Sequence, residues 1–289
     1  MTTLGPSTTP GTYEYQVLDA LHDPNNNRWS IAQIDGYINE ARKQLVMDSG
    51  CLRTLQQSYL SQGVEQYQFG AVAGASILTP GSGYSAPTVA FSGGGGTGAA
   101  AVVTQSGGAL NTIVFTSYGS GYTSAPTATV TDSTGAGASV QVGVINISTF
   151  DILGVHVLWG TQRYSLDWYP FSLFSARYRL YTAATYQRRP DAMAFYGEQS
   201  LFIGVTPDQT YGLELDSVIL PTPFVTGDTT TQDASPLRNQ DPIKFFVAYL
   251  AKNNAQNFGE AEGFRRQYAT RLLEVCASYT RRIGSIYAT

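Results

Sequence analysis

The sequence of 289 residues has little lysine, histidine or cysteine and no long apolar run. Arginine supplies 14 of the 17 basic residues, and the two histidines, His22 and His156, lie in no recognisable triad context. Cys51 and Cys276 cannot form a disulfide framework, and a buried thiol is the plainer interpretation of each. We expect no membrane span, and no signal peptide because residues 1–12 lack its basic and apolar regions.

Motifs for nucleotide, metal and ester chemistry are also missing. Residues 93–98 match G-x-G-x-x-G, but a strand-like Ala/Val/Thr run follows them instead of the helix that a dinucleotide site needs. The chain has no G-x-S-x-G elbow and no C-x-x-C or H-x-x-x-H pair that would hold zinc. We therefore expect no cofactor, no metal and no catalytic residue, and a protein that is not an enzyme.

One group of carboxylates leaves an alternative open. Glu198, Asp208, Glu214 and Asp216 fall within a short stretch, and a glycosidase uses two such groups as acid and base or nucleophile. If 200–203 and 211–216 are paired antiparallel strands, Glu214 and Asp216 share one face. That spacing is equally normal for the solvated edge of a sheet, which we favour.

The segment 71–149 contains a single charged residue, Asp132, and 15 of the 30 glycines. It repeats itself once: GSGY at 81–84 returns at 119–122, and TGA at 97–99 returns at 134–136. Short Val/Thr/Ala runs alternate with these glycine turns, which predicts strands and hairpins. We interpret 71–149 as an inserted all-β module, here called the β-module, with a two-fold internal repeat. A disordered glycine-rich linker is the weaker alternative.

Helical patterns lie on both sides of the β-module. Ser30 and Gln33 have capping-box spacing, an apolar face follows, and Gly50 fits a helix stop. Further helices are expected at 13–22, about 51–60, 172–184, from 241 to about 254, and in a last stripe up to 283. The predicted fold is α+β: the N- and C-terminal helices form a bundle, with a β-hairpin or extended middle region and the inserted module. The predicted divisions are 1–70, 71–149 and 150–289.

Arginine is concentrated in two segments, 163–189 and 265–282, whereas 191–241 is acidic. Solvated faces would explain this, but so would charge complementarity between neighbouring subunits or with a partner, a role that suits the planar arginine fork. A formal net charge of −4 and a pI near 5.2 argue against nucleic-acid binding as the main role, although transient contact with passing DNA stays open.

Residues 29–30, 38–42 and 48–53, together with 188–199, 207–211 and 218–221, resemble the head-to-tail adaptor (connector) proteins of tailed, podovirus-like bacteriophages. The likeness covers roughly 13–70 and 150–285, and the β-module departs from it as an insertion. The resemblance implies a structural virion protein in the viral neck, made in the host cytoplasm, that forms a homo-oligomeric ring, commonly a dodecamer. The ring would join the portal protein to the tail or nozzle protein, away from any membrane.

Two further consequences belong to that resemblance. The β-module would face outward or toward tail components, and the C-terminal segment would dock on the portal. The residues expected in portal or intersubunit contacts are Arg177, Arg179, Arg188, Arg189, Arg265, Arg266, Arg271, Tyr279, Arg281, Arg282, Ile286 and Tyr287. Two other functions remain open: a carbohydrate-binding or glycan-hydrolysing surface protein, and an adhesin or fibre component whose helices trimerise.

Overall fold

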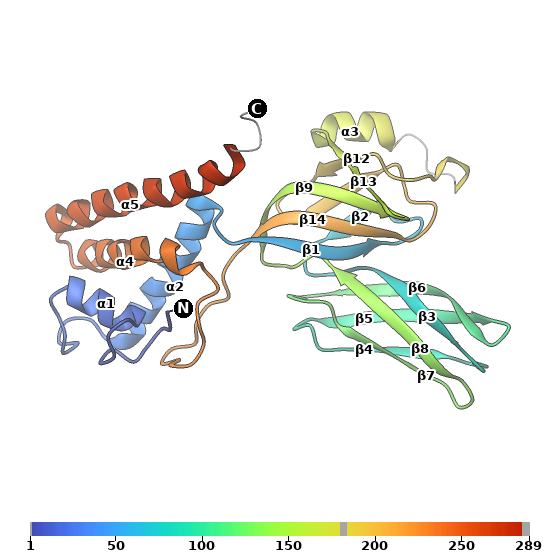
Figure 1. Ribbon diagram of the computed structural model, residues 1–289, viewed down its shortest axis with the longest axis horizontal. Helices are drawn as coiled ribbons and strands as arrows, with labels where there is room; N and C mark the ends of the chain where they lie inside the picture. The colour runs from blue at the N-terminus through green and yellow to red at the C-terminus, as the bar shows by residue number, and fades with distance from the viewer. Residues whose placement is uncertain (1, 180–183, 285–289) are drawn as a thin grey trace. The chain divides into compact units, whose positions relative to one another are not determined.

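The computed structural model describes residues 2–179 and 184–284, and it divides into two compact units. Residues 1–53 and 218–289 form one, here called the helical unit, and residues 54–217 form the other, the β unit. Strands make up 37% of the chain and belong to several sheets (Figure 1). The expected α+β fold built on a helical bundle is therefore wrong, because the chain is mostly β-sheet.

The helical unit takes helices from both ends of the chain. They are α1 (Tyr13–Ala20), α2 (Ile31–Ser49), α4 (Asp241–Asn254) and α5 (Phe258–Gly284), with a 3₁₀ turn, η2 (Leu237–Asn239), before α4. The capping box predicted for α2 is confirmed: Ser30 Oγ accepts from Gln33 N, and Gln33 Oε1 accepts from Ser30 N. Gly50 ends the helix in the left-handed conformation, as predicted. One core of buried apolar side chains joins these helices, including Ile34, Leu45, Ile243, Val247 and Val275.

Two four-stranded sheets build most of the β unit outside the β-module. The first has the order β1 (Arg53–Leu60), β14 (Tyr211–Ile219), β9 (Thr149–Trp159), β10 (Gln162–Ser165). The second has the order β11 (Asp167–Trp168), β12 (Ala192–Phe195), β13 (Ser200–Gly204), β2 (Gln66–Gln68). The chain thus enters the unit in β1 and leaves it in the neighbouring strand β14.

The two sheets share a core, and a helix packs on one of them. Val157 and Leu213 from the first sheet lie in one cluster with Leu201 and Ile203 from the second. Side chains alternate along a strand, so Phe202 points the other way and packs against α3 (Phe171–Tyr178), which is followed by the 3₁₀ turn η1 (Ala184–Tyr186). The unit therefore has three layers here: helix, sheet and sheet (Figure 1).

The segment predicted as a helix at 51–60 is strand β1, which is a second correction. Its inward row contains Thr54, Gln56 and Ser58, so no apolar alternation is visible in the sequence. The polar groups are satisfied in the sheet, where Gln56 Nε2 donates to Thr149 Oγ1 at 2.8 Å and to Ser217 Oγ at 2.6 Å. Cross-strand partners that lie far away in the sequence decide the structure of this segment.

The strands expected at 200–203 and 211–216 exist but do not pair with each other. They are β13 and β14, and they belong to different sheets. β13 pairs antiparallel with β12, with Met193 opposite Ile203, and with β2, with Leu201 opposite Tyr67. The hairpin that we inferred from their proximity in sequence is therefore wrong.

Strands β3 to β8 form the β-module: β3 (Val72–Ser82), β4 (Thr88–Ser92), β5 (Thr97–Ser106), β6 (Ala109–Ser120), β7 (Thr127–Thr131) and β8 (Ala136–Val144). They pair antiparallel as β3–β8, β4–β7 and β5–β6. The first repeat contains β3, β4 and β5, and the second contains the equivalent strands β6, β7 and β8. Each pair therefore joins one strand from each repeat, and the two repeats have equivalent places in the module. The module has two small apolar cores, which are also equivalent between the two repeats. One lies under Tyr122 and the other under Tyr84, the tyrosines of the two GSGY turns.

Glycine is required where these tyrosines pack. A Cβ on Gly135 would lie 2.5 Å from the Tyr84 ring, and a Cβ on Gly96 would lie 2.5 Å from the Tyr122 ring. Both distances are far below van der Waals contact. The glycine cluster that follows the GSGY turn in each repeat therefore leaves room for the tyrosine ring of the GSGY turn in the other repeat.

Candidate interaction surfaces

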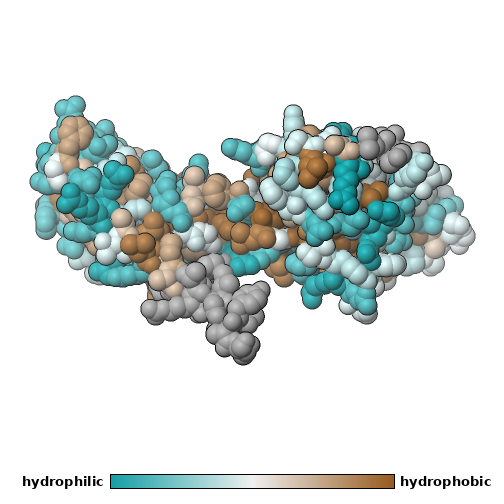
Figure 2. Space-filling model, turned by 90° about the horizontal axis from the view of Figure 1, so that it is seen from above, coloured by the Kyte–Doolittle hydropathy of each residue, from teal (hydrophilic) through white to brown (hydrophobic). Residues whose placement is uncertain are grey.

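The second sheet of the β unit carries an arginine-edged aromatic surface around α3, here called the α3 surface. Phe171 contacts Tyr196 with ring centroids 4.6 Å apart and Phe202 at 5.0 Å. Large apolar side chains beside this cluster are exposed: Trp168 by 59%, Leu173 by 53% and Tyr196 by 58%. Figure 2 shows a mostly hydrophilic face of the β unit that is broken by apolar patches. Aromatic and arginine side chains together are the composition of interface centres.

Two predicted contact residues belong to the α3 surface. The guanidinium of Arg177 lies 5.7 Å from the ring centre of Tyr169. Arg179 lies 5.1 Å from that of Phe202 and forms an ion pair of 3.0 Å with Glu65. The cations lie at ring distances where cation–π attraction operates. Sequence reasoning identified these arginines by their charge but missed the exposed apolar side chains beside them, which the aromatic density of 164–178 could have indicated.

The other two predicted arginines of this unit lie after η1. Arg188 forms an ion pair of 3.4 Å with Asp191 that is largely exposed. Arg189 stacks on Tyr164 at 3.8 Å and lies 5.3 Å from the ring centre of Trp159. Arg189 is thus held against aromatic rings on the first sheet, while Arg177 and Arg179 lie at the second.

The second arginine segment belongs to α5. Arg265 and Arg266 pair with Glu262 at 3.8 and 3.6 Å, and Arg271 pairs with Asp241 at 3.3 Å and with Glu274 at 3.2 Å. The first pairs are strongly exposed, so water screens them and each contributes at most about 1 kcal/mol. Tyr279, Arg281 and Arg282 fall within the backbone of α5, and Ile286 and Tyr287 lie outside the described residues.

Some arginines of the basic segments form ion pairs with acids of the same chain. Arg163 pairs with the buried Glu214 at 3.1 Å, and Arg271 pairs with Asp241 in the helical unit. Both acids come from the acidic segment 191–241. Charge complementarity in the sequence therefore does not require a neighbouring subunit at these two places.

The helical unit contains a buried ion pair that sequence reasoning did not identify. Arg42 Nη2 lies 2.8 Å from Asp233 Oδ1, and both side chains are almost completely buried. Tyr13 donates its hydroxyl to the same carboxylate, and the guanidinium lies 3.9 Å from the Phe224 ring centre. Burial alone would raise the pKa of Asp233, but the hydrogen bond and charge of Arg42 hold it below the usual value.

A pair of buried acidic residues, Glu14 and Asp35, lies in the same unit. Burial and the neighbouring Asp35 raise the pKa of Glu14 from 4.5 to about 7. Burial also raises the pKa of Asp35, whose Oδ2 accepts from Gly227 N at 3.1 Å. Two neighbouring carboxyl groups disfavour each other's charged form, so the pair retains a proton to a higher pH than a free carboxyl group. This arrangement lies in the core between α1 and α2, so its role is structural.

The carboxylates weighed as catalysts do not form one site in the structure. Glu198 lies in the turn between β12 and β13, and Asp208 follows β13 and accepts from the Tyr211 hydroxyl at 2.7 Å. Glu214 is buried with Arg163, and Asp216 lies two residues further along β14. Glu214 is therefore bound as an ion-pair partner.

The remaining reactive residues are dispersed as well. Cys51 is buried in the helical unit, where burial raises its thiol pKa, and Cys276 lies on α5. His22 follows α1, and His156 lies in β9 of the other unit. Within residues 2–179 and 184–284, no group of three or more His, Cys, Asp or Glu side chains is placed to hold a metal ion.

Comparison with protein-family models and with curated proteins gives no match for this chain. No helix in the described part of the chain is long and apolar enough to cross a membrane.

Proposed function

We propose that this chain is a head-to-tail adaptor of a tailed bacteriophage, a structural virion protein whose copies close into a ring between the portal and the tail or nozzle. The proposal starts from the sequence resemblance in 29–53 and 188–221. The observation that carries it is that each unit exposes its own set of large apolar side chains. The most exposed of those in the helical unit are Val225, Leu237, Phe258 and Leu273, with exposed fractions of 76, 63, 65 and 70%.

Ring assembly needs two different surfaces on one chain. In a closed ring, one face of a subunit binds a different face of the next, and the rotation between them brings the last copy back to the first. The α3 surface supplies aromatic, leucine and arginine side chains for one face. The exposed apolar side chains of the helical unit would contact the next subunit or the portal.

The portal contact is assigned to α5, the C-terminal helix. Arg265 and Arg266 have exposed side chains, and their ion pairs with Glu262 cost little to exchange for a partner carboxylate. Leu273 on the same helix is 70% exposed, which adds an apolar anchor. Arginine with an apolar neighbour suits a desolvated contact.

Assembly can be tested with the purified full chain, alone and mixed with the portal protein of the particle that contains it. Mass photometry and negative-stain electron microscopy should show a closed ring, at least in the mixture. Leu173→Asp on the α3 surface should prevent closure, whereas Leu78→Asp, an equally exposed leucine on β3, should not. A chain that stays monomeric and binds no portal refutes the adaptor, and a stable trimer instead favours the fibre alternative.

A further inference from the structure

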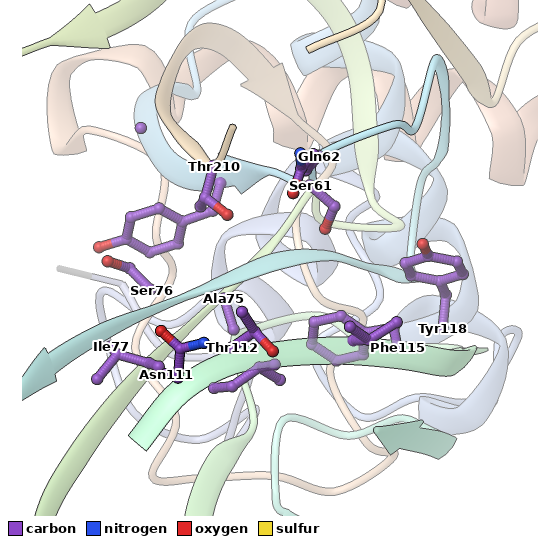
Figure 3. Close-up of a pocket in the computed structure, with 14 residues that line it drawn as sticks. Ser61, Gln62, Ala75, Ser76, Ile77, Asn111, Thr112, Phe115, Tyr118 and Thr210 are labelled. Atoms are coloured by element: carbon purple, nitrogen blue, oxygen red, sulfur yellow. The ribbon is translucent and has the colours of Figure 1, made fainter. Parts of the chain in front are cut away.

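A cavity of about 390 Å³ lies inside the β unit, between the β-module and the first sheet. Its walls come from the end of β1 and the turn after it, from β3 and β6 of the β-module, and from the start of β14. Figure 3 shows Phe115 and Tyr118 along one side, Thr112 and Asn111 on the same strand, and Ser61 and Gln62 across from them. The volume is in the usual range for small-ligand sites.

The walls are fixed by close backbone packing. A Cβ on Gly143 would lie 2.3 Å from Tyr59 N, and a Cβ on Gly74 would lie 2.8 Å from Tyr59 O. Only glycine at these positions lets β3 and β8 approach β1 so closely. The Tyr59 hydroxyl donates to Gln141 Oε1 at 2.7 Å, which ties the same wall to β8. The cavity is therefore built in advance rather than formed by a ligand.

The lining combines aromatic and aliphatic side chains with amides and hydroxyls. The rings of Phe115 and Tyr118 are stacked with centroids 5.6 Å apart and an angle of 26°. Asn111 and Gln62 bring exposed amides to the rim, each with a donor and an acceptor. None of the fourteen described lining residues is charged. A phosphate or carboxylate ligand would find no cation here to balance its charge.

We propose that this cavity binds a neutral saccharide unit. A sugar ring has an apolar C–H face that can stack on Phe115 and Tyr118, and an edge of hydroxyl groups that match the rim amides. A purely apolar ligand would displace water from those amides and from the Ser76 hydroxyl without replacing its hydrogen bonds, which costs affinity. The proposal assigns binding only, and it does not depend on ring assembly.

Binding can be measured with the full chain on an array of neutral oligosaccharides built from hexoses, deoxyhexoses and N-acetylhexosamines, with acidic glycans as the comparison. Isothermal titration calorimetry then gives the affinity for the neutral glycan that binds best. Tyr118→Ala should weaken binding at least tenfold because the stacking surface is lost, and Asn111→Ala should weaken it several-fold. Asn111 is exposed, so its variant tests the site even if Tyr118→Ala fails to fold.

Matched controls lie outside the cavity. Phe150→Ala removes a 45% exposed aromatic side chain of the same unit, and Thr116→Ala removes an exposed side chain from β6 itself. Both should bind like the unaltered chain. Three results would each overturn the proposal: no neutral glycan is bound, acidic glycans are bound as well or better, or the affinity is unchanged in both Tyr118→Ala and Asn111→Ala.

Discussion

Replacing Arg42 by methionine tests the buried ion pair of the helical unit. The substitution keeps the volume and apolar stem but leaves the Asp233 carboxylate, which is fully buried, with the Tyr13 hydroxyl as its remaining side-chain donor. Removing one partner of a buried pair costs about 3–5 kcal/mol, because the other charge stays desolvated. Loss of the guanidinium over the Phe224 ring adds to this. We expect Arg42→Met to lower the free energy of unfolding of this unit by about 3–5 kcal/mol.

The measurement must isolate the helical unit, since a chain of two units need not unfold in one step. Trp29 is buried in that unit, whereas the other tryptophans, Trp159 and Trp168, belong to the β unit and are half exposed. In a Trp159→Phe/Trp168→Phe background, tryptophan fluorescence during guanidinium unfolding therefore reports on the helical unit alone. The matched control is Arg266→Met, whose side chain is 79% exposed, with an expected change within about 0.5 kcal/mol.

Acidity provides a second check of the same reasoning. The pKa of Asp233 is held below its ordinary value of 3.8, so the stability from the pair is present above that pH and is lost as the pH falls through the lower, folded value. The difference between Arg42→Met and the parent should therefore shrink in acid, where protonation neutralises the orphaned carboxylate. A loss below about 1 kcal/mol at neutral pH would refute the idea that Asp233 depends on Arg42.

Three further predictions concern stability. Because the pKa of Glu14 is about 7 in the fold and 4.5 in the unfolded chain, its contribution to stability should fall by up to about 3 kcal/mol as the pH rises from 4.5 to 7. Glu14→Gln should remove this contribution from pH-dependent unfolding curves and leave only the smaller fall due to Asp35. Gly36→Ala, at an exposed site inside α2 with no atom near the added Cβ, should stabilise the helical unit by about 0.5–1 kcal/mol in guanidinium unfolding; a loss would contradict the open space there. Gly135→Ala should displace the Tyr84 ring from its packed position and speed the exchange of backbone amide hydrogens across 109–144. Unchanged amide exchange would contradict the close packing of Tyr84 on Gly135.

The sequence points to the α3 surface but not to the cavity beside Tyr118. The α3 surface contains residues that the sequence offers directly, since Arg177 and Arg179 stand in an aromatic-rich segment. The cavity combines Gln62, Asn111 and Thr210, which come from three distant segments. No spacing along the chain relates these three residues, so only the packing of the β-module on the first sheet brings them together.

Local interactions explain what the sequence alone determined. The limits of α2 follow from Ser30, Gln33 and Gly50, because a capping box and a left-handed stop act within one helical turn. The repeat of 71–149 likewise marks its strands, since each GSGY turn demands the same backbone whatever surrounds it.

Tertiary structure decided the rest. Segment 53–60 is a strand because Gln56 finds partners at Thr149 and Ser217, and no neighbour in sequence could reveal that. β13 and β14 lie in different sheets although six residues separate them, because each pairs with strands from elsewhere in the chain. Pairing and burial in a sheet are settled between segments distant in sequence, whereas helix ends and tight turns are settled within a few residues, and this chain is mostly sheet.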